Sequence, residues 1–336
     1  MKSTQIRLGA RPHGEPDART FETVTVDLPE LEEGQVLLRT VYLSLDPYMR
    51  GRMSSARSYA TPLEVGDVII GGTVCEVEES RHADVPAGSM VLAYTGWQTH
   101  ALTDGRAVRV LDTSVPVSTA LGVLGMPGFT AYAGLLEIGK PQDGETVVVA
   151  AATGPVGSAV GQIAKVKGAR AVGIAGGPEK CRALVEEFGF DAAVDHRSPT
   201  FAADLKAACP DGIDVYFENV GGKVLEAVVP LLNTYARVPV CGLVSGYNAT
   251  AMPEGPDRWG WFMSQVLTRS LTVRGFIQDE FTRSHGRDFL RDMTTWVADG
   301  DVRYREDVVE GLENAPEAFV GMLRGKNFGK QLVKVS

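Results

Sequence analysis

The stretch TVVVAAATGPVGSAVGQIAKVKG, residues 146–168, gives the clearest indication of the fold. A continuous apolar strand runs into the turn TGPVG (153–157), and a helical apolar spacing follows at once. In this context Gly154 lets backbone approach a pyrophosphate, and Gly157 lets the start of the helix pack tightly, while the helix N-terminus offers N–H donors to an anion. Ala152 stands in the place of the usual first glycine. The stretch predicts a dinucleotide-binding loop, and a tight turn in an unrelated α/β protein is the alternative.

On both sides of this stretch the pattern changes. Upstream, from Ile6 to about Val110, short β-rich pieces such as ETVTVDL and QVLLRTVYLSL are separated by Gly, Pro and Asp turns. Downstream, apolar strands alternate with helical segments, which is what a parallel sheet covered on both faces requires. A chain of 336 residues exceeds the usual size of one hydrophobic core. We therefore expect a compact β-rich domain followed by a doubly wound parallel sheet, with a helix from Phe281 to about Gly300 and a final strand in KQLVKVS.

The end of the second strand of that sheet predicts which dinucleotide binds. A carboxylate there would hydrogen-bond the adenosine ribose and select NAD, but the sequence reads Gly176-Gly177-Pro178-Glu179-Lys180. The glycines leave room for a 2′-phosphate, and Lys180, three residues after Gly177, places an ammonium close to it. NADPH is the expected cofactor. The alternative for Lys180 is a solvated residue in the first turn of a helix.

Composition excludes several classes of protein. A net charge of −9 and a pI near 5.2 argue against a nucleic-acid partner, which needs a concentrated basic surface. The four cysteines are far apart, and no apolar run has the length of a signal peptide core or a membrane span. We expect reduced thiols, no membrane association and a cytoplasmic location.

The sequence also lacks the residues of two common catalytic sites. Its five histidines are scattered, and no Cys or His spacing assembles a catalytic metal, so no metal ligands are assigned. The pattern Gly-x-Ser-x-Gly of a nucleophile elbow is absent. Without a metal, a conjugated carbonyl is the easier substrate to reduce, because hydride at its β-carbon places charge on an enolate that a hydroxyl can stabilise.

Five motifs in order carry a resemblance over essentially the whole chain. They are DPYMRGRM (46–53), GMPG (125–128), ATGPVG (152–157), ENVGG (218–222) and GKNFGK (325–330). Together they resemble the zinc-independent medium-chain dehydrogenase/reductases, which include prostaglandin reductase, leukotriene 12-hydroxydehydrogenase, plant double-bond reductases and bacterial curcumin reductase. The resemblance implies a GroES-like catalytic (substrate) domain, residues 1–125 and 303–336, and a Rossmann NADP-binding domain, residues 126–302.

The resemblance also implies site residues. Tyr48 and Tyr247 match tyrosines that face the substrate, and we expect them to orient it or relay a proton. The ribose 2′-hydroxyl is a competing donor, and aromatic lining alone is the other interpretation of both tyrosines. His196 stands where relatives usually carry a tyrosine near the adenosine phosphate, so its contact stays open. The residues expected at the cofactor are Met126, Thr130, Gly154, Pro155, Val156, Gly157, Lys180, His196, Asn219, Cys241, Gly242, Ser245, Tyr247, Phe276, Ile277, Asn327 and Gly329.

Three activities remain in competition. The leading expectation is an NADP-dependent oxidoreductase acting on CH–CH donors, which reduces the C=C bond of α,β-unsaturated ketones and aldehydes. The alternatives are an NADPH-dependent quinone reductase and an NADPH-binding protein without turnover. The stretch 251–263, rich in loop-forming and large apolar residues, either covers the substrate or packs at the contact of a homodimer. A homodimer is the expected assembly, from kinship alone.

Overall fold

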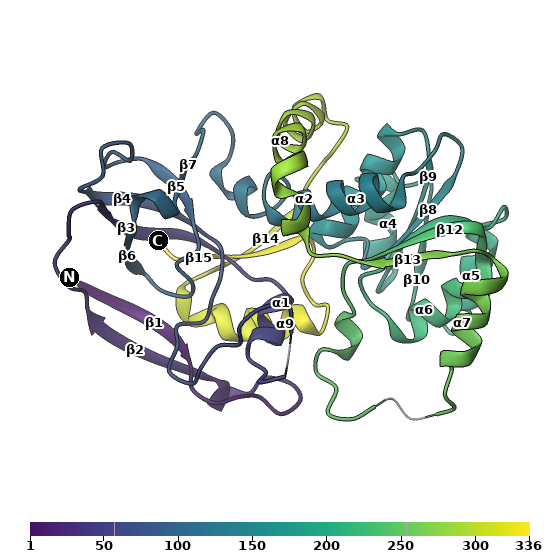
Figure 1. Cartoon of the computed structure of the whole chain (residues 1–336), viewed down its shortest axis with the longest axis horizontal. Coiled ribbons are helices and arrows are strands. Elements are labelled where there is room, and N and C mark those ends of the chain that lie inside the picture. Colours follow the sequence, from purple (N-terminus) through teal and green to yellow (C-terminus); the bar gives the residue numbers. More distant parts are fainter. Residues whose placement is uncertain (57, 253–254) are drawn as a thin grey trace. The chain divides into compact units, whose positions relative to one another are not determined.

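The computed structural model describes residues 1–56, 58–252 and 255–336. The chain forms two compact units, one made of Met1–Gly122 and Glu306–Ser336 and the other of Val123–Arg305. Figure 1 labels their elements along the chain. Each unit is described below by itself.

The first unit is built mainly of antiparallel strands. Within the described residues one sheet has the order β14-β15-β3-β4-β5-β7, with β6 paired to β3, and β1 pairs with β2 separately. The last strand of the chain lies beside β3, with Leu332 opposite Ser44. The strands are β1 (Lys2–Leu8), β2 (Phe21–Asp27), β3 (Gln35–Ser44), β4 (Thr73–Ser80), β5 (Met90–Ala93), β6 (His100–Asp104), β7 (Arg109–Val110), β14 (Glu306–Glu310) and β15 (Lys330–Lys334).

Aromatic packing joins the layers of this unit. Trp97 is fully buried, stacks on Phe21 at 5.8 Å and meets the edge of Phe319 at 5.7 Å. The contacts tie β2 and a helix near the C-terminus to one core. The helices of the unit are α1 (Tyr48–Arg52) and α9 (Ala315–Leu323), with 3-10 turns η1 (Ala18–Thr20), η2 (Gly105–Ala107), η3 (Val117–Leu121) and η8 (Leu312–Asn314).

The second unit is a doubly wound α/β fold. Its strands run in the order β10-β9-β8-β11-β12-β13, and each neighbouring pair is parallel. This order is that of a dinucleotide-binding sheet. The strands are β8 (Thr146–Ala150), β9 (Arg170–Ala175), β10 (Ala192–Asp195), β11 (Ile213–Phe217), β12 (Leu232–Val240) and β13 (Thr272–Gly275).

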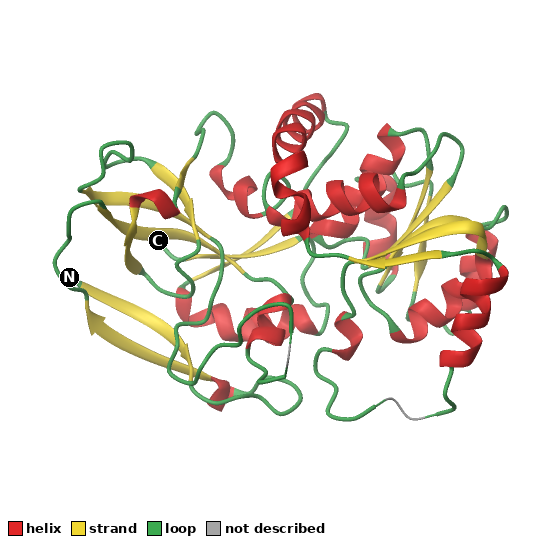
Figure 2. Ribbon diagram, in the orientation of Figure 1, coloured by secondary structure: helices red, strands yellow, loops and turns green. Residues whose placement is uncertain are grey.

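Helices cover the two faces of that sheet, as Figure 2 shows in red around the yellow strands. The helices are α2 (Met126–Ala133), the π-helix η4 (Gly134–Gly139), α3 (Pro155–Val166), α4 (Pro178–Glu186), α5 (Phe201–Ala208), α6 (Gly222–Val228), α7 (Trp259–Thr268) and α8 (Thr282–Asp299), with 3-10 turns η5 (Val229–Leu231), η6 (Val244–Gly246) and η7 (Gln278–Phe281).

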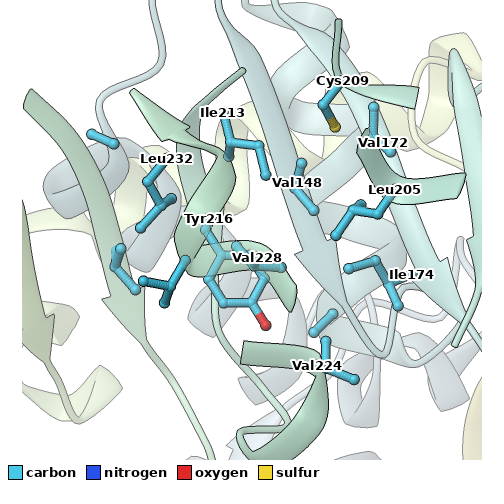
Figure 3. Close-up of a cluster of buried hydrophobic side chains, with 14 of the residues drawn as sticks. Val148, Val172, Ile174, Leu205, Cys209, Ile213, Tyr216, Val224, Val228 and Leu232 are labelled. Atoms are coloured by element: carbon cyan, nitrogen blue, oxygen red, sulfur yellow. The ribbon is translucent and has the colours of Figure 1, made fainter. Parts of the chain in front are cut away.

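One core of the second unit lies between the sheet and helices α5 and α6. Figure 3 shows Val148, Val172 and Ile174 of the strands facing Leu205 of α5 and Val224 of α6. Each of these side chains is buried. Residues that alternate with them, such as Gly173, face the opposite layer, where the Leu184 side chain of α4 lies close. Burial on both faces explains why these strands read as continuous apolar runs rather than as alternating ones.

The fold class expected from the sequence is confirmed. The helix expected from Phe281 to Gly300 is α8, and KQLVKVS contains β15. The helical spacing near Leu121 is divided, because η3 ends at Leu121 and α2 begins only at Met126, while the π-helix η4 follows α2 directly. A search of the described residues for a helix long and apolar enough to cross a membrane found none.

Candidate functional site

The loop between β8 and α3 has the geometry of a phosphate-binding turn. Gly154 is the N-cap of α3, no side chain caps it, and Pro155 begins the helix. Proline needs no partner for an N–H, and the following first-turn N–H groups, those of Val156 and Gly157, point out of the helix end. The helix dipole adds partial positive charge at the same end. The loop therefore offers backbone donors to an anion without competition from a capping side chain.

Two backbone features hold this loop close to the sheet. Ala151 has φ +51°, the left-handed conformation, which turns its carbonyl toward α3. A Cβ at Gly157 would lie 2.4 Å from that oxygen and 2.7 Å from Cα of Ala152. Only glycine fits this approach. The sequence predicted tight packing at Gly157, and in the structure this packing is a close contact of Gly157 with the backbone of Ala151 and Ala152.

The ends of β9 and β10 bring together a second set of candidate site residues. The Asp195 carboxylate accepts the N–H of Gly177 and that of Arg197, each at 2.9 Å, and so fastens two loops together. A Cβ at Gly176 would lie 2.8 Å from Nε of Arg197 and 2.9 Å from Nε2 of His196. The guanidinium and the imidazole therefore lie over the glycine that stands where a NAD-selective carboxylate would be.

Lys180 is a second cation close to His196. It lies in the first turn of α4, near enough to His196 for its charge to lower the imidazole pKa. Partial desolvation is the largest cause of that lowered pKa, and the charge of Arg197 is the next. Arg197 was missed by the sequence reasoning, which had stopped at His196. The sequence feature that could have indicated Arg197 is its position directly after His196, in the loop that follows β10.

A third loop, after β11, brings another set of expected residues together. The Asn219 side-chain amide donates to the Ala150 carbonyl at 2.8 Å, next to the phosphate-binding turn. Ser245 donates through its hydroxyl to the Val220 carbonyl at 2.6 Å. A Cβ at Gly242 would lie 3.2 Å from the Tyr247 hydroxyl and 3.5 Å from the Asn219 carbonyl oxygen. The strand ends of β8, β11 and β12 therefore gather Asn219, Gly242, Ser245 and Tyr247 in one place.

Glu218 organises this loop and was missed as a site residue. Its buried carboxylate accepts the N–H of Val220 at 2.5 Å and of Gly221 at 2.9 Å. Burial raises the pKa of Glu218, although these two donors oppose the shift. Burial, with the nearby charge of Glu218, also raises the pKa of the Cys241 thiol to about 12. The thiol is therefore protonated at neutral pH and is no nucleophile there.

The remaining expected residues of the second unit are largely occupied by internal contacts. The Thr130 hydroxyl donates to the Met126 carbonyl at 2.8 Å. The Phe276 ring is buried and meets the Phe217 ring edge-on at 6.1 Å. The Ile277 N–H donates to the Glu280 carboxylate at 2.9 Å. Thr130 and Phe276 therefore shape the surroundings of the site mainly through packing.

In the first unit, the structure places Tyr48 at the start of α1, half-buried. Burial is the largest cause of a raised pKa for the Tyr48 phenol, and Asp46 comes next. Tyr94 and Tyr59 are also close enough to raise it, and both are well exposed. The guanidinium of Arg52 lies 5.7 Å from the centre of the Tyr59 ring. Sequence reasoning found Tyr48 but missed this group of three tyrosines, because Tyr59 and Tyr94 lie outside the motif around Tyr48.

The first unit also holds the two expected cofactor residues near the C-terminus. The Asn327 side-chain amide donates to the Gly329 carbonyl at 2.8 Å. Gly329 has φ +95°, a conformation that favours glycine. These residues form a short turn directly before β15.

The stretch 251–263 is only partly described, because Pro253 and Glu254 lie outside the described residues. Trp259 begins α7 and is 67% exposed, while Phe262 packs partly against the core shown in Figure 3. Large apolar groups of this stretch therefore face solvent within their own unit.

The second unit fits a dinucleotide. It has a strand order that reverses at β8, an uncapped helix N-terminus at the reversal, backbone packed too closely for a side chain at Gly157, and the Arg197 guanidinium over Gly176. Fold and site together define a two-unit nicotinamide-nucleotide dehydrogenase.

Comparisons with known proteins agree with this class. Residues 4–111 match the family model described as the N-terminal domain of oxidoreductase, and residues 155–293 match that of zinc-binding dehydrogenase. NADPH-dependent curcumin reductase of Escherichia coli (strain K12) is 56% identical over 332 residues, which cover 98% of this chain and 96% of that protein. Prostaglandin reductase 1 of Oryctolagus cuniculus is 44% identical, over 95% of this chain and 89% of that protein.

A solved structure is similar over nearly its whole length. The crystal structure of CurA in complex with NADPH from Vibrio vulnificus has a TM-score of 0.96 and 55% sequence identity, with 99% of each chain covered. The chain belongs to the zinc-independent medium-chain dehydrogenase/reductase family, in the group that contains curcumin reductase and prostaglandin reductase.

The name of the second family model refers to zinc. Among residues 1–56, 58–252 and 255–336, no group of three or more His, Cys, Asp or Glu side chains is arranged to hold a metal ion.

Proposed function

We propose that this protein is an NADPH-dependent reductase of the C=C bond of α,β-unsaturated ketones and aldehydes. The observation that carries the choice of cofactor is that the Arg197 guanidinium and the His196 imidazole lie over Gly176, with Lys180 near His196, in the place of a ribose-binding carboxylate. The names of the related curcumin and prostaglandin reductases support the class of substrate. NADPH would lie along the second unit, with its pyrophosphate at the turn from Gly154 to Gly157.

The residues of the chain would bind and protonate rather than donate electrons. When bound, NADPH would supply the hydride for the β-carbon of the substrate. The charge that develops on the carbonyl oxygen needs a hydrogen-bond donor, and a proton must then reach the α-carbon. The pKa of Tyr48 is raised by burial and by Asp46, so its hydroxyl keeps its proton at neutral pH and can serve as that donor. Tyr247 is the second candidate, and the ribose 2′-hydroxyl competes with both.

The proposed activity predicts oxidation of NADPH by simple enones. With 3-nonen-2-one we expect the absorbance at 340 nm to fall in proportion to enzyme, and mass spectrometry to identify the saturated ketone. NADH should react more slowly, because it lacks the phosphate that Arg197 and Lys180 would contact. A matched series of quinones separates the related activity: turnover of quinones without turnover of any enone or enal would contradict the proposal. Binding of NADPH without turnover of either series would indicate a non-catalytic protein.

We further propose that two copies associate through the second unit. β13 is the edge strand of its sheet, and all four of its residues are exposed. Leu267, on the neighbouring helix α7, is 80% exposed, and Trp259 is 67% exposed. An open strand edge beside exposed apolar side chains favours pairing with another strand edge. The identical β13 edge of a second copy would supply hydrogen-bond partners for this strand edge.

The proposal predicts that the protein is a dimer and that charged substitutions on β13 and α7 dissociate it. Light scattering after gel filtration should give twice the chain mass for the wild type and the mass of one chain for the variant Leu267→Glu/Val273→Lys. Val308→Lys is the matched control, since Val308 is an exposed valine on β14, an edge strand of the other unit, and it should remain dimeric. A monomeric wild type at micromolar concentration would contradict the proposal. The cytoplasmic location expected from the sequence stays a prediction.

A further inference from the structure

A buried ion pair joins two motifs that are 284 residues apart in the sequence. The Lys330 ammonium lies 2.6 Å from Oδ1 of Asp46 and donates to the Leu45 carbonyl at 2.8 Å. The other carboxylate oxygen of Asp46 accepts the hydroxyl of Ser44. The side chains of Lys330 and Asp46 are only 3% and 7% exposed. Both residues belong to the first unit.

Each partner of the pair is next to a candidate site residue. Asp46 precedes α1, and its carbonyl accepts the Met49 N–H at 3.1 Å, so it fixes the first turn of the helix on which Tyr48 is the first residue. Lys330 begins β15 directly after Gly329 and the turn that holds Asn327. The pair thus sets where the Tyr48 helix starts relative to the C-terminal turn.

Stability alone is a weak reason for such a pair. Removing two charges from water costs several kcal/mol per ion, and well-packed apolar residues of similar volume often stabilise a protein as well or better. A buried pair does restrict geometry, because only one arrangement brings both charges and their further hydrogen bonds together. In this cluster the restricted geometry is that of the backbone directly before Tyr48.

A second carboxylate is close to Lys330. Glu306 lies opposite Lys330 in the ladder of β14 and β15, and its Oε1 atom is buried without a hydrogen-bond partner. Lys330 is among the groups that act electrostatically on Glu306. The ammonium therefore keeps a nearby carboxylate if the charge of Asp46 is removed, but two carboxylates lose a nearby cation if Lys330 is removed.

We propose that the Asp46–Lys330 pair is a positioning device for Tyr48, holding its hydroxyl where it can donate to the substrate. The inference rests on the proposed function, because it concerns the donor in that reaction. Asp46 and Lys330 are positioning residues and touch no reacting atom. Most of the residues expected at NADPH belong to the second unit, and Asp46→Asn leaves the turn of Asn327 and Gly329 in place, so this variant is expected to bind NADPH with unchanged affinity.

The test is a double-mutant cycle between Asp46→Asn and Tyr48→Phe. Asp46→Asn keeps the size of the side chain and an oxygen for Lys330, and Glu306 still balances the ammonium, so the variant is expected to fold. We expect kcat for 3-nonen-2-one to fall about tenfold, as for a slightly misplaced catalytic group, with the Kd of NADPH unchanged. In the Tyr48→Phe background the same change should cost less than about twofold, because the hydroxyl that it positions is already absent.

A second variant keeps the test decisive if Asp46→Asn folds poorly. Asp46→Leu/Lys330→Met/Glu306→Gln removes the charges of the pair and of Glu306, so no ion of this cluster is left buried without a partner, and the variant should retain a melting temperature near that of wild type. Its kcat should also fall about tenfold. Asp191→Asn is the matched control, because Asp191 forms a 2.7 Å pair with Lys165 that is more exposed and remote in sequence from both motifs, and kcat should not change.

The outcomes separate the two proposals. An active wild type beside a fully active Asp46→Asn would remove the positioning role and leave the proposed function intact. Equal losses from Asp46→Asn with and without the Tyr48 hydroxyl would also remove it, because a purely structural effect is additive. Absence of enone turnover by the wild type would instead contradict the proposed function, and the positioning role with it.

Discussion

Replacing Gly157 with alanine is expected to reduce the affinity for NADPH by roughly a hundredfold, or about 3 kcal/mol. The added Cβ would lie 2.4 Å from the Ala151 carbonyl oxygen and 2.7 Å from Cα of Ala152, and neither atom belongs to a flexible side chain. Relief requires α3 to move away from the end of β8, whose residues are buried. The first-turn N–H groups of α3 would then leave the position of the pyrophosphate. Titration of NADPH fluorescence measures the loss.

A matched glycine elsewhere provides the control for this experiment. Gly286 lies in α8, and a Cβ there would meet no atom within 4 Å. Gly286→Ala should leave the affinity for NADPH unchanged and raise stability by up to about 1 kcal/mol, because alanine favours a helix. Overpacking at Gly157 should instead lower the free energy of unfolding by about 1–3 kcal/mol. Tight NADPH binding by Gly157→Ala would contradict the assignment of the phosphate-binding turn.

The double variant Lys180→Ala/Arg197→Ala is expected to abolish the preference for NADPH over NADH. A hydrogen bond to a charged group contributes about 1.5–3 kcal/mol, so losing both cations should weaken NADPH binding by a hundredfold or more. NADH has no 2′-phosphate, and its affinity should change by less than about twofold. The Kd values of both nucleotides, measured at one ionic strength, give the selectivity directly.

The control and the single variants assign the effect to each cation. Arg182 is an exposed cation on the same helix as Lys180, and Arg182→Ala should leave the selectivity unchanged. If Lys180→Ala alone removes the whole preference, Arg197 does not contact the phosphate. Equal losses of NADPH and NADH affinity would show that neither cation contacts the 2′-phosphate and that the variants disturb the loops after β9 and β10.

These experiments address different parts of the site. The Gly157 variant tests where the pyrophosphate lies, and the cation variants test how the 2′-phosphate is recognised. The cycle between Asp46 and Tyr48 tests the donor on the first unit. The Gly157 variant changes the affinity for NADPH, the cation variants change the ratio of NADPH to NADH affinity, and the cycle changes kcat, so a wrong assignment in one part leaves the others open to test.

The sequence by itself determined the fold class and located the turn from Gly154 to Gly157, whose phosphate-binding role stays a prediction. Continuous apolar strands, helical spacing and the glycines of TGPVG are local signals, since each depends on residues a few positions apart. The absence of a carboxylate at Gly176 was visible for the same reason. The motifs around Tyr48 and Asn219 were found through the resemblance, and their roles stay predictions.

Only the tertiary structure decided which side chains meet. Arg197 lies over Gly176 because β9 and β10 end side by side. The spacing of residues along the chain does not predict this pairing. Tyr59 and Tyr94 are near Tyr48, and Lys330 reaches Asp46, for a similar reason. Contacts between distant residues arise from strand pairing and core packing, whereas sequence patterns report on near neighbours. The long-range partners of the site therefore became visible only in the folded chain.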